Sequence, residues 1–155
     1  MLSKMAALLA LALWFGGGVV AGFVAPQAAF AGLADRQLAG SIAGAVLSTY
    51  AIVVLICGLM YVLSHLAARI NGASWSRLTL ILIVAALIIV AISQFVLTPE
   101  IADLRAEIRG TGETPELQGR FGAYHQLSVI LFAIQWLLAA VALVRHGMYL
   151  AARRH

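Results

Sequence analysis

The chain has 155 residues, of which 63% are hydrophobic and only 10% are charged. A water-soluble domain carries about a quarter charged residues and less than half apolar ones, so this composition excludes an ordinary soluble fold and indicates solvation by lipid. The formal charge of +4 comes from basic residues that lie singly along the chain, which argues against a nucleic-acid surface. The length suits a single domain covering residues 1–155.

Four stretches of the chain carry no charged residue and are long enough to cross a bilayer. They run from Met5 to Val24, from Ile42 to Leu63, from Leu78 to Leu97 and from Leu127 to Val144. A helix needs about 20 apolar residues to cross about 30 Å of hydrocarbon. Inside lipid every backbone N–H and C=O must be paired within its own segment, which favours helix. The sequence therefore predicts an all-α membrane protein, a bundle of four transmembrane helices.

The first stretch also has features of a secretory signal peptide. Lys4 precedes the apolar run, and Ala29-Phe30-Ala31 resembles a small-x-small cleavage site. The run is longer than the apolar region of a typical signal peptide, which spans about 7–15 residues. Trp14 and the three glycines at 16–18 are also typical of a packed helix. We therefore favour a true membrane span.

Small residues recur at helical spacing in the first two spans. Gly18 and Gly22 are one turn apart in the first, and Gly40, Gly44 and Ser48 follow one face of the second. In lipid, small residues let helix backbones approach each other. Both stripes predict packing within one four-helix bundle, with oligomerisation as the alternative.

Aromatic and imidazole side chains occur near the ends of the predicted spans. The aromatic ones are Trp14, Tyr61, Trp75, Tyr124 and Trp136. Such rings are typical of the boundary between lipid and water. His65 and His146 fall near the same end of the bundle, and we expect both to be interfacial, with a shared metal or haem as the alternative. Cys57 is the single cysteine, which excludes a disulfide within the chain.

The segment between the third and fourth spans is the one substantial stretch outside the membrane. Pro99 suits the first turn of a helix, on which Ile101, Leu104 and Ile108 share one face. The Gly110-Thr111-Gly112 stretch ends this helix, and Thr114-Pro115 can cap and begin the next. The sequence thus predicts a short amphipathic helical segment between helices 3 and 4, lying on the membrane surface or at the bundle mouth, with its charges on a solvated face.

Lysine and arginine are unevenly distributed between the two predicted sides of the membrane. One side holds Lys4, Arg69, Arg77, Arg145, Arg153 and Arg154, and no acidic residue. The other side holds Arg36, Arg105, Arg109 and Arg120 together with Asp35, Glu100, Asp103, Glu107, Glu113 and Glu116. Because basic residues collect on the cytoplasmic side, we predict that both termini are cytoplasmic. We place this multi-pass protein in a bacterial inner membrane.

Polar side chains at the start of the fourth span form the candidate site. No ionisable residue lies in the middle of any span, which argues against a proton pump or a voltage sensor. His125 begins the fourth span on the acidic side, and Ser128 follows one turn later. We expect the imidazole to point toward the end of the third span and to find a polar partner there or in a loop, where it could bind a cation or relay a proton. The alternative is a histidine that only caps the helix or lies at the interface.

Three groups of residues resemble the transmembrane protein 205-like family, also known as domain of unknown function 4149, whose members are four-helix membrane proteins of about this length. They are Trp14-Phe15-Gly16-Gly17 with Ala25-Pro26 and Phe30; Leu97-Thr98-Pro99 with Ile101 to Glu107; and Phe121-x-x-Tyr124-His125-x-x-Ser128. The chain departs from the family at Phe132, where an asparagine is common. The resemblance implies the fold more than an activity. A haem-pathway oxidase group fits less well, because its first span carries a histidine and Met5–Val24 has none.

The sequence therefore favours a small, non-enzymatic membrane protein whose non-cytoplasmic mouth binds a small cation or polar ligand. The residues that we assign to this mouth are Pro26, Glu100, Tyr124, His125 and Ser128. An accessory subunit that packs against a larger membrane complex is the alternative, and a homo-oligomer is compatible with both. The usual enzyme motifs are missing, so a membrane enzyme comes third and no cofactor is predicted.

Overall fold

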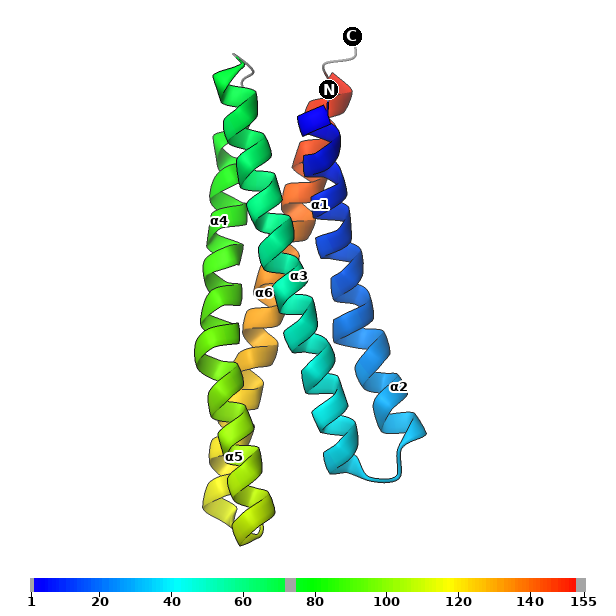
Figure 1. Ribbon diagram of the computed structural model, residues 1–155, viewed down its shortest axis with the longest axis vertical. Helices are drawn as coiled ribbons and strands as arrows, with labels where there is room; N and C mark the ends of the chain where they lie inside the picture. Colours follow the sequence, from blue (N-terminus) through cyan, green and yellow to red (C-terminus); the bar gives the residue numbers. More distant parts are fainter. Residues whose placement is uncertain (1, 72–74, 153–155) are drawn as a thin grey trace.

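A computed structural model describes residues 2–71 and 75–152, in which every regular element is a helix (Figure 1). The elements are α1 (Leu2–Val19), η1 (Val20–Val24), α2 (Ala25–Gly32), α3 (Arg36–Ile70), α4 (Arg77–Ile92), η2 (Ser93–Leu97), α5 (Thr98–Thr111) and α6 (Pro115–Ala152). The two π-helical turns, η1 and η2, join their neighbours without interruption. The all-α prediction is therefore confirmed for the described residues.

The four helical segments are longer than the predicted spans. Each is apolar enough to cross a membrane, and they contain 30, 35, 35 and 38 residues in chain order. At 1.5 Å per residue these segments measure about 45 to about 57 Å, well beyond the roughly 30 Å of hydrocarbon. The predicted amphipathic segment is α5, which continues the third span through η2 as an extension of the same helix. The second predicted short helix is the first part of α6.

Local sequence signals set the ends of these helices. The Asp35 carboxylate accepts hydrogen bonds from two backbone N–H groups in the first turn of α3, at 2.8 and 3.1 Å. The Thr114 hydroxyl accepts one from the Leu117 backbone N–H at 3.3 Å, in front of α6. Gly112 ends α5 with φ of 88°, a conformation that favours glycine. The predicted break after α5 and the predicted cap of α6 are both confirmed.

The two halves of the chain bend by the same device. Pro26 follows η1 near the start of α2, and Pro99 follows η2 near the start of α5. A proline inside a helix has no N–H to donate, and its ring crowds the carbonyl four residues earlier. A π-helical turn in front of the proline absorbs this mismatch, and the Thr98 hydroxyl also donates to the Ser93 carbonyl at 3.0 Å. Each helical hairpin is therefore built from a bent first helix and an unbroken second one.

The bundle is closed at one end and divided at the other. Toward the termini, α1 packs against α3 and α6, and α4 packs against α3 and α6. Toward the opposite end, α2 packs against α3 while α5 packs against α6, and these two pairs diverge (Figure 1). Lys4, Arg69, Arg77 and Arg145 share the closed end as predicted; Arg153 and Arg154 lie outside the described residues.

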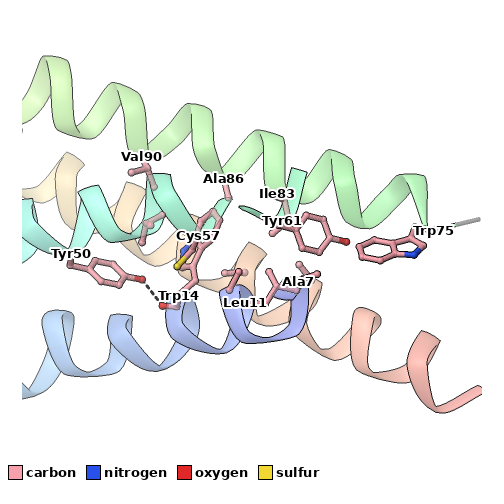
Figure 2. Packing of buried hydrophobic residues seen from close by; sticks show 14 of the residues in the cluster. Ala7, Leu11, Trp14, Tyr50, Cys57, Tyr61, Trp75, Ile83, Ala86 and Val90 are labelled. Atoms are coloured by element: carbon pink, nitrogen blue, oxygen red, sulfur yellow. Dashed lines mark hydrogen bonds between the residues drawn. The ribbon is translucent and has the colours of Figure 1, made fainter. Parts of the chain in front are cut away.

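The core of the closed part is formed around Trp14, which is fully buried (Figure 2). Its indole Nε1 donates to Gln135 Oε1 at 2.7 Å, which joins α1 to α6. The Tyr50 hydroxyl donates to the Trp14 carbonyl at 2.7 Å, which joins α3 to α1. Its burial agrees with the packed helix that Trp14 and the following glycines predict, and its one polar atom finds a partner inside the bundle and not at the membrane surface.

The glycines of α1 and η1 make room for aromatic side chains of α6. A Cβ at Gly18 would lie 2.5 Å from Trp136 Cδ1, and one at Gly22 would lie 2.5 Å from the Phe132 ring. Trp136 also stacks on Phe15, with ring centroids 4.8 Å apart. The prediction that this stripe packs within one bundle is confirmed, although a side chain and not a backbone fills the space.

Candidate functional site

A cleft of about 980 Å³ opens between the diverging pairs α2–α3 and α5–α6. Binding pockets for small molecules commonly measure about 300–1,000 Å³. On α3 the cleft is lined from Arg36 to Val54, which corresponds to about 27 Å at 1.5 Å per residue. It therefore extends from the outer end of the hairpins to the middle of the membrane-spanning bundle.

The outer end of the cleft is positively charged. Arg36, Arg105 and Arg109 line it, together with one carboxylate, that of Glu113. Glu113 Oε2 already accepts a hydrogen bond from Gln118 Nε2 at 2.7 Å. Three guanidinium groups against one carboxylate give the lining a net charge of +2. This charge attracts anions, whereas the carboxylate-rich surface expected from the sequence would attract cations.

Arg105 is the central basic residue of the cleft. It is partly buried, and its guanidinium lies 5.5 Å from the centroid of the Phe121 ring on α6, within the range of a cation–π contact. Within the described ranges, no carboxylate lies close enough to form an ion pair with it, and it donates no hydrogen bond. A guanidinium has five N–H donors in a planar fork that matches carboxylate and phosphate groups. Arg105 thus offers an unneutralised anion-binding group inside a cleft.

The small-residue stripe of α3 faces this guanidinium. A Cβ at Gly44 would lie 3.1 Å from Arg105 Nη1, and a Cβ at Gly40 would lie 3.9 Å from Arg105 Nη2. Ser48, the third member of the stripe, also lines the cleft. The stripe therefore faces the inside of the same bundle as predicted, but its neighbour is the Arg105 side chain and not a helix backbone. The missing side chains give Arg105 space to reach across from α5 to α3.

The inner end of the cleft is mostly apolar. Tyr50, Val54, Val90, Phe132 and Leu137 are among the residues that line it. The Tyr50 hydroxyl is already engaged by the Trp14 carbonyl, as described above. The cleft therefore changes from a charged outer end to an apolar inner end.

The structure brings three of the five predicted site residues into the cleft. Pro26, His125 and Ser128 line it, whereas Glu100 and Tyr124 are not among the lining residues. Glu100 is exposed, and Tyr124 is partly buried. The structure therefore brings three of the predicted residues to the cleft and leaves the acidic residue and the tyrosine outside its lining.

His125 lacks the polar partner that we expected. Its side chain is exposed, and its ring stacks on Phe121 with centroids 6.0 Å apart and planes 2° apart. The Ser128 hydroxyl donates to the His125 backbone carbonyl at 2.7 Å, a bond within the helix. In the part of the chain that the structure describes, the imidazole makes no hydrogen bond. The expected contact with the third span is wrong, because Phe121 on the same helix holds the ring instead.

Arg105 is the functional candidate that the sequence analysis missed. The sequence analysis predicts that the charged residues of α5, including Arg105, lie on its solvated face. However, Arg105 is four residues after Ile101 and three before Ile108, and all three line the cleft. Residues three and four apart share one helix face. The available signal was a single basic residue within the apolar face of an amphipathic helix.

A second group of polar side chains is buried at the closed end. His65 is 0% exposed and His146 is 3% exposed, so the prediction that both are interfacial is wrong. The Trp75 ring lies against both imidazoles, with centroids 5.6 Å from His65 and 4.9 Å from His146. Among residues 2–71 and 75–152, no group of three or more histidine, cysteine or acidic side chains could hold a metal ion. The two histidines are part of an aromatic cluster that packs the closed end.

These features define a multi-pass helical membrane protein with a ligand-sized cleft between two hairpins. The model of the family described as "Domain of unknown function (DUF4149)" matches residues 9–109, and the chain belongs to this family. The matched region contains Pro26 and Arg105 and ends before α6, which carries His125. No curated protein and no solved structure matches the chain.

Proposed function

We propose that this protein binds a small anionic ligand in the cleft, with Arg105 as the main contact. The observation that supports this function is the partly buried guanidinium of Arg105, which has no acidic partner in the described chain. Removing a charge from water is costly unless an opposite charge and hydrogen bonds compensate it. An anion bound to the Arg105 guanidinium within the cleft would provide both. This proposal retains the polar ligand that the sequence analysis suggested, but the ligand is an anion and not a cation.

We also propose an orientation and a location for the cleft. The described basic residues of the closed end are accompanied by no acidic residue, which favours a cytoplasmic position for that end and for both termini. The cleft then opens on the non-cytoplasmic side of a bacterial inner membrane. We further propose that the chain is related to the transmembrane protein 205-like proteins, on the motifs around Trp14, Pro26 and Pro99.

The test uses inorganic phosphate as the probe and thermal unfolding in a nonionic detergent as the readout. Arg105→Gln removes the charge and keeps a polar side chain of similar length. Arg120→Gln is the matched control, because Arg120 is exposed and does not line the cleft. A charge-assisted hydrogen bond contributes about 1.5–3 kcal/mol, so Arg105→Gln should weaken phosphate binding about tenfold or more. Chloride at the same ionic strength controls for a general salt effect.

Two results would contradict this function. Phosphate could fail to raise the unfolding temperature of the wild type above the chloride control, or Arg105→Gln could respond as Arg120→Gln does. His125→Ala tests the earlier hypothesis in the same assay, and we expect it to retain most of the phosphate response. If the protein instead acts as an accessory subunit, it should co-purify with a stoichiometric protein partner whose retention does not depend on Arg105.

A further inference from the structure

We infer that the anion is the headgroup of a membrane lipid with a net negative charge, and that one acyl chain of this lipid lies along the inner part of the cleft. This inference rests on the proposed anion binding at Arg105 and names the class of ligand. It follows from the length of the cleft, the nature of its walls and the distribution of charge along it.

The inner part of the cleft, from the Arg105 guanidinium inward, matches one leaflet of a bilayer in length. Gly44, which faces the Arg105 guanidinium, and Val54, the innermost lining residue of α3, are ten residues apart. Ten helical residues rise about 15 Å, and half of a hydrocarbon core of about 30 Å is also about 15 Å. Gly44 is near the outer end of the charge-free run from Ile42 to Leu63. A lipid whose headgroup contacts Arg105 would therefore have its acyl chain within the hydrocarbon of a single leaflet.

The walls of the cleft suit a hydrocarbon chain. Phe23, Leu47, Ala51, Val129 and Phe132 are among the lining residues. Phe23 is 50% exposed and Val129 is 52% exposed, so these walls are not closed by the protein itself. Apolar walls in contact with water would be unfavourable, whereas an acyl chain that enters sideways from the bilayer covers them. A small soluble anion would fill only the outer part.

The charge of the outer end favours an anionic over a zwitterionic headgroup. Arg36 and Arg109 line the cleft together with Arg105, and the single carboxylate of Glu113 is bonded to Gln118. A phosphodiester without a cationic substituent can accept hydrogen bonds from Arg105 while its charge is balanced by the neighbouring arginines. A phosphocholine headgroup would place its own ammonium group among the same arginines, and like charges repel.

The experiment measures lipid retention by native mass spectrometry after delipidation and transfer into mixed micelles. The micelles contain a nonionic detergent with either dioleoylphosphatidylglycerol or dioleoylphosphatidylcholine. We expect the wild type to retain one phosphatidylglycerol at a concentration about tenfold lower than is needed for phosphatidylcholine. Arg105→Gln should lose this preference, Arg105→Lys should keep part of it, and Arg120→Gln should behave as the wild type.

A second pair of variants tests the acyl-chain position. Ala51→Phe places a ring in the inner cleft, whereas Ala45→Phe adds the same ring at an exposed position of α3 outside the lining. Ala51→Phe should reduce phosphatidylglycerol retention about tenfold while the response to inorganic phosphate stays at the wild-type level. Ala45→Phe should change neither quantity.

The outcomes separate this inference from the proposed function. If glycerol phosphate binds as tightly as phosphatidylglycerol, or if Ala51→Phe retains the lipid fully, the anion site stands and the lipid is excluded. If phosphatidylcholine is retained equally well, headgroup selection at Arg105 is excluded. If neither phosphate nor phosphatidylglycerol depends on Arg105, both the proposed function and the lipid inference fail. Should Arg105→Gln not fold, Arg105→Lys and Ala51→Phe still decide between these outcomes.

Discussion

One buried hydrogen bond connects α1 to α6 in the middle of the bundle. The Trp14 indole donates to Gln135, and both side chains are at most 3% exposed. Loss of the Gln135 side chain leaves the buried indole N–H of Trp14 without its partner. We expect Gln135→Leu to lower the free energy of unfolding in detergent by about 1–2 kcal/mol, because a buried donor without a partner costs about that much.

A matched control and a double variant isolate the contribution of this bond. Gln94→Leu changes another glutamine near the membrane, and in the described chain Gln94 makes no hydrogen bond. It should alter stability by less than about 0.5 kcal/mol. In a double-mutant cycle, Gln135→Leu should lower the free energy of unfolding much less in the Trp14→Phe background than in the wild type. Additive losses would show that the bond contributes nothing specific.

Single residues were the hardest to assign from the sequence. His125 attracted attention because it is an ionisable group at the start of a span, yet the structure shows it exposed and stacked on Phe121. Arg105 was overlooked because arginines on an amphipathic helix are usually solvated. Whether Arg105 reaches the cleft depends on how α5 is rotated against α3, and tertiary packing determines this rotation. Helical spacing alone indicates that Arg105 shares a face with Ile101 and Ile108.

At the scale of the helices, two glycines of α1 that lie two residues apart differ in their surroundings. A Cβ at Gly18 would lie 2.5 Å from Trp136 Cδ1 and 2.8 Å from the Tyr50 hydroxyl, whereas a Cβ at Gly16 would meet nothing within 4 Å. The Trp136 ring cannot move freely, because its Nε1 donates to the Phe15 carbonyl at 3.0 Å. We expect Gly18→Ala to destabilise the protein by about 1–3 kcal/mol, as overpacking does.

The neighbouring substitution provides the control for this prediction. Gly16→Ala should leave stability unchanged or raise it by about 0.5–1 kcal/mol, since alanine favours helix over glycine and no neighbour is displaced. Both variants are compared by thermal unfolding in the same detergent. Equal effects at the two positions would mean that α1 does not contact α6 as the structure shows.

The sequence predicted the membrane helices better than their ends. Charge-free runs identify the hydrocarbon-crossing part, because only that part must avoid ionised groups. They do not show that α5 continues the third span or that the helix beginning at Pro115 continues into the fourth, because these extensions lie beyond the run and carry charge. Pro26 and Pro99 were visible in the sequence, but the π-helical turns that precede them depend on how the chain relieves the missing N–H. This local change of hydrogen-bonding pattern leaves no compositional signal.

At the scale of the whole molecule, two similar hairpins meet firmly at one end and diverge at the other. The closed end contains the aromatic and histidine cluster, and the divided end contains the cleft. Because α2 and α5 each follow a π-helical turn and a proline, both hairpins bend at corresponding places. The cleft is thus a consequence of the bundle's architecture. The sequence analysis assigned its candidate site to this end of the molecule, through the polar residues around His125, but could not indicate the space between the hairpins.

The orientation of the molecule decides which leaflet supplies the ligand, and cysteine labelling tests it. Cys57 is buried, and replacing it with alanine gives a background without a native thiol. In that background, Thr111→Cys places a thiol at the exposed end of α5, and Asn71→Cys places one at the exposed end of α3. A membrane-impermeant maleimide added to intact cells should label position 111 and should reach position 71 only after permeabilisation, because the basic closed end is retained in the cytoplasm. The reverse pattern would place the cleft and its arginines in the cytoplasmic leaflet, while the four spans and the binding site would be unaffected.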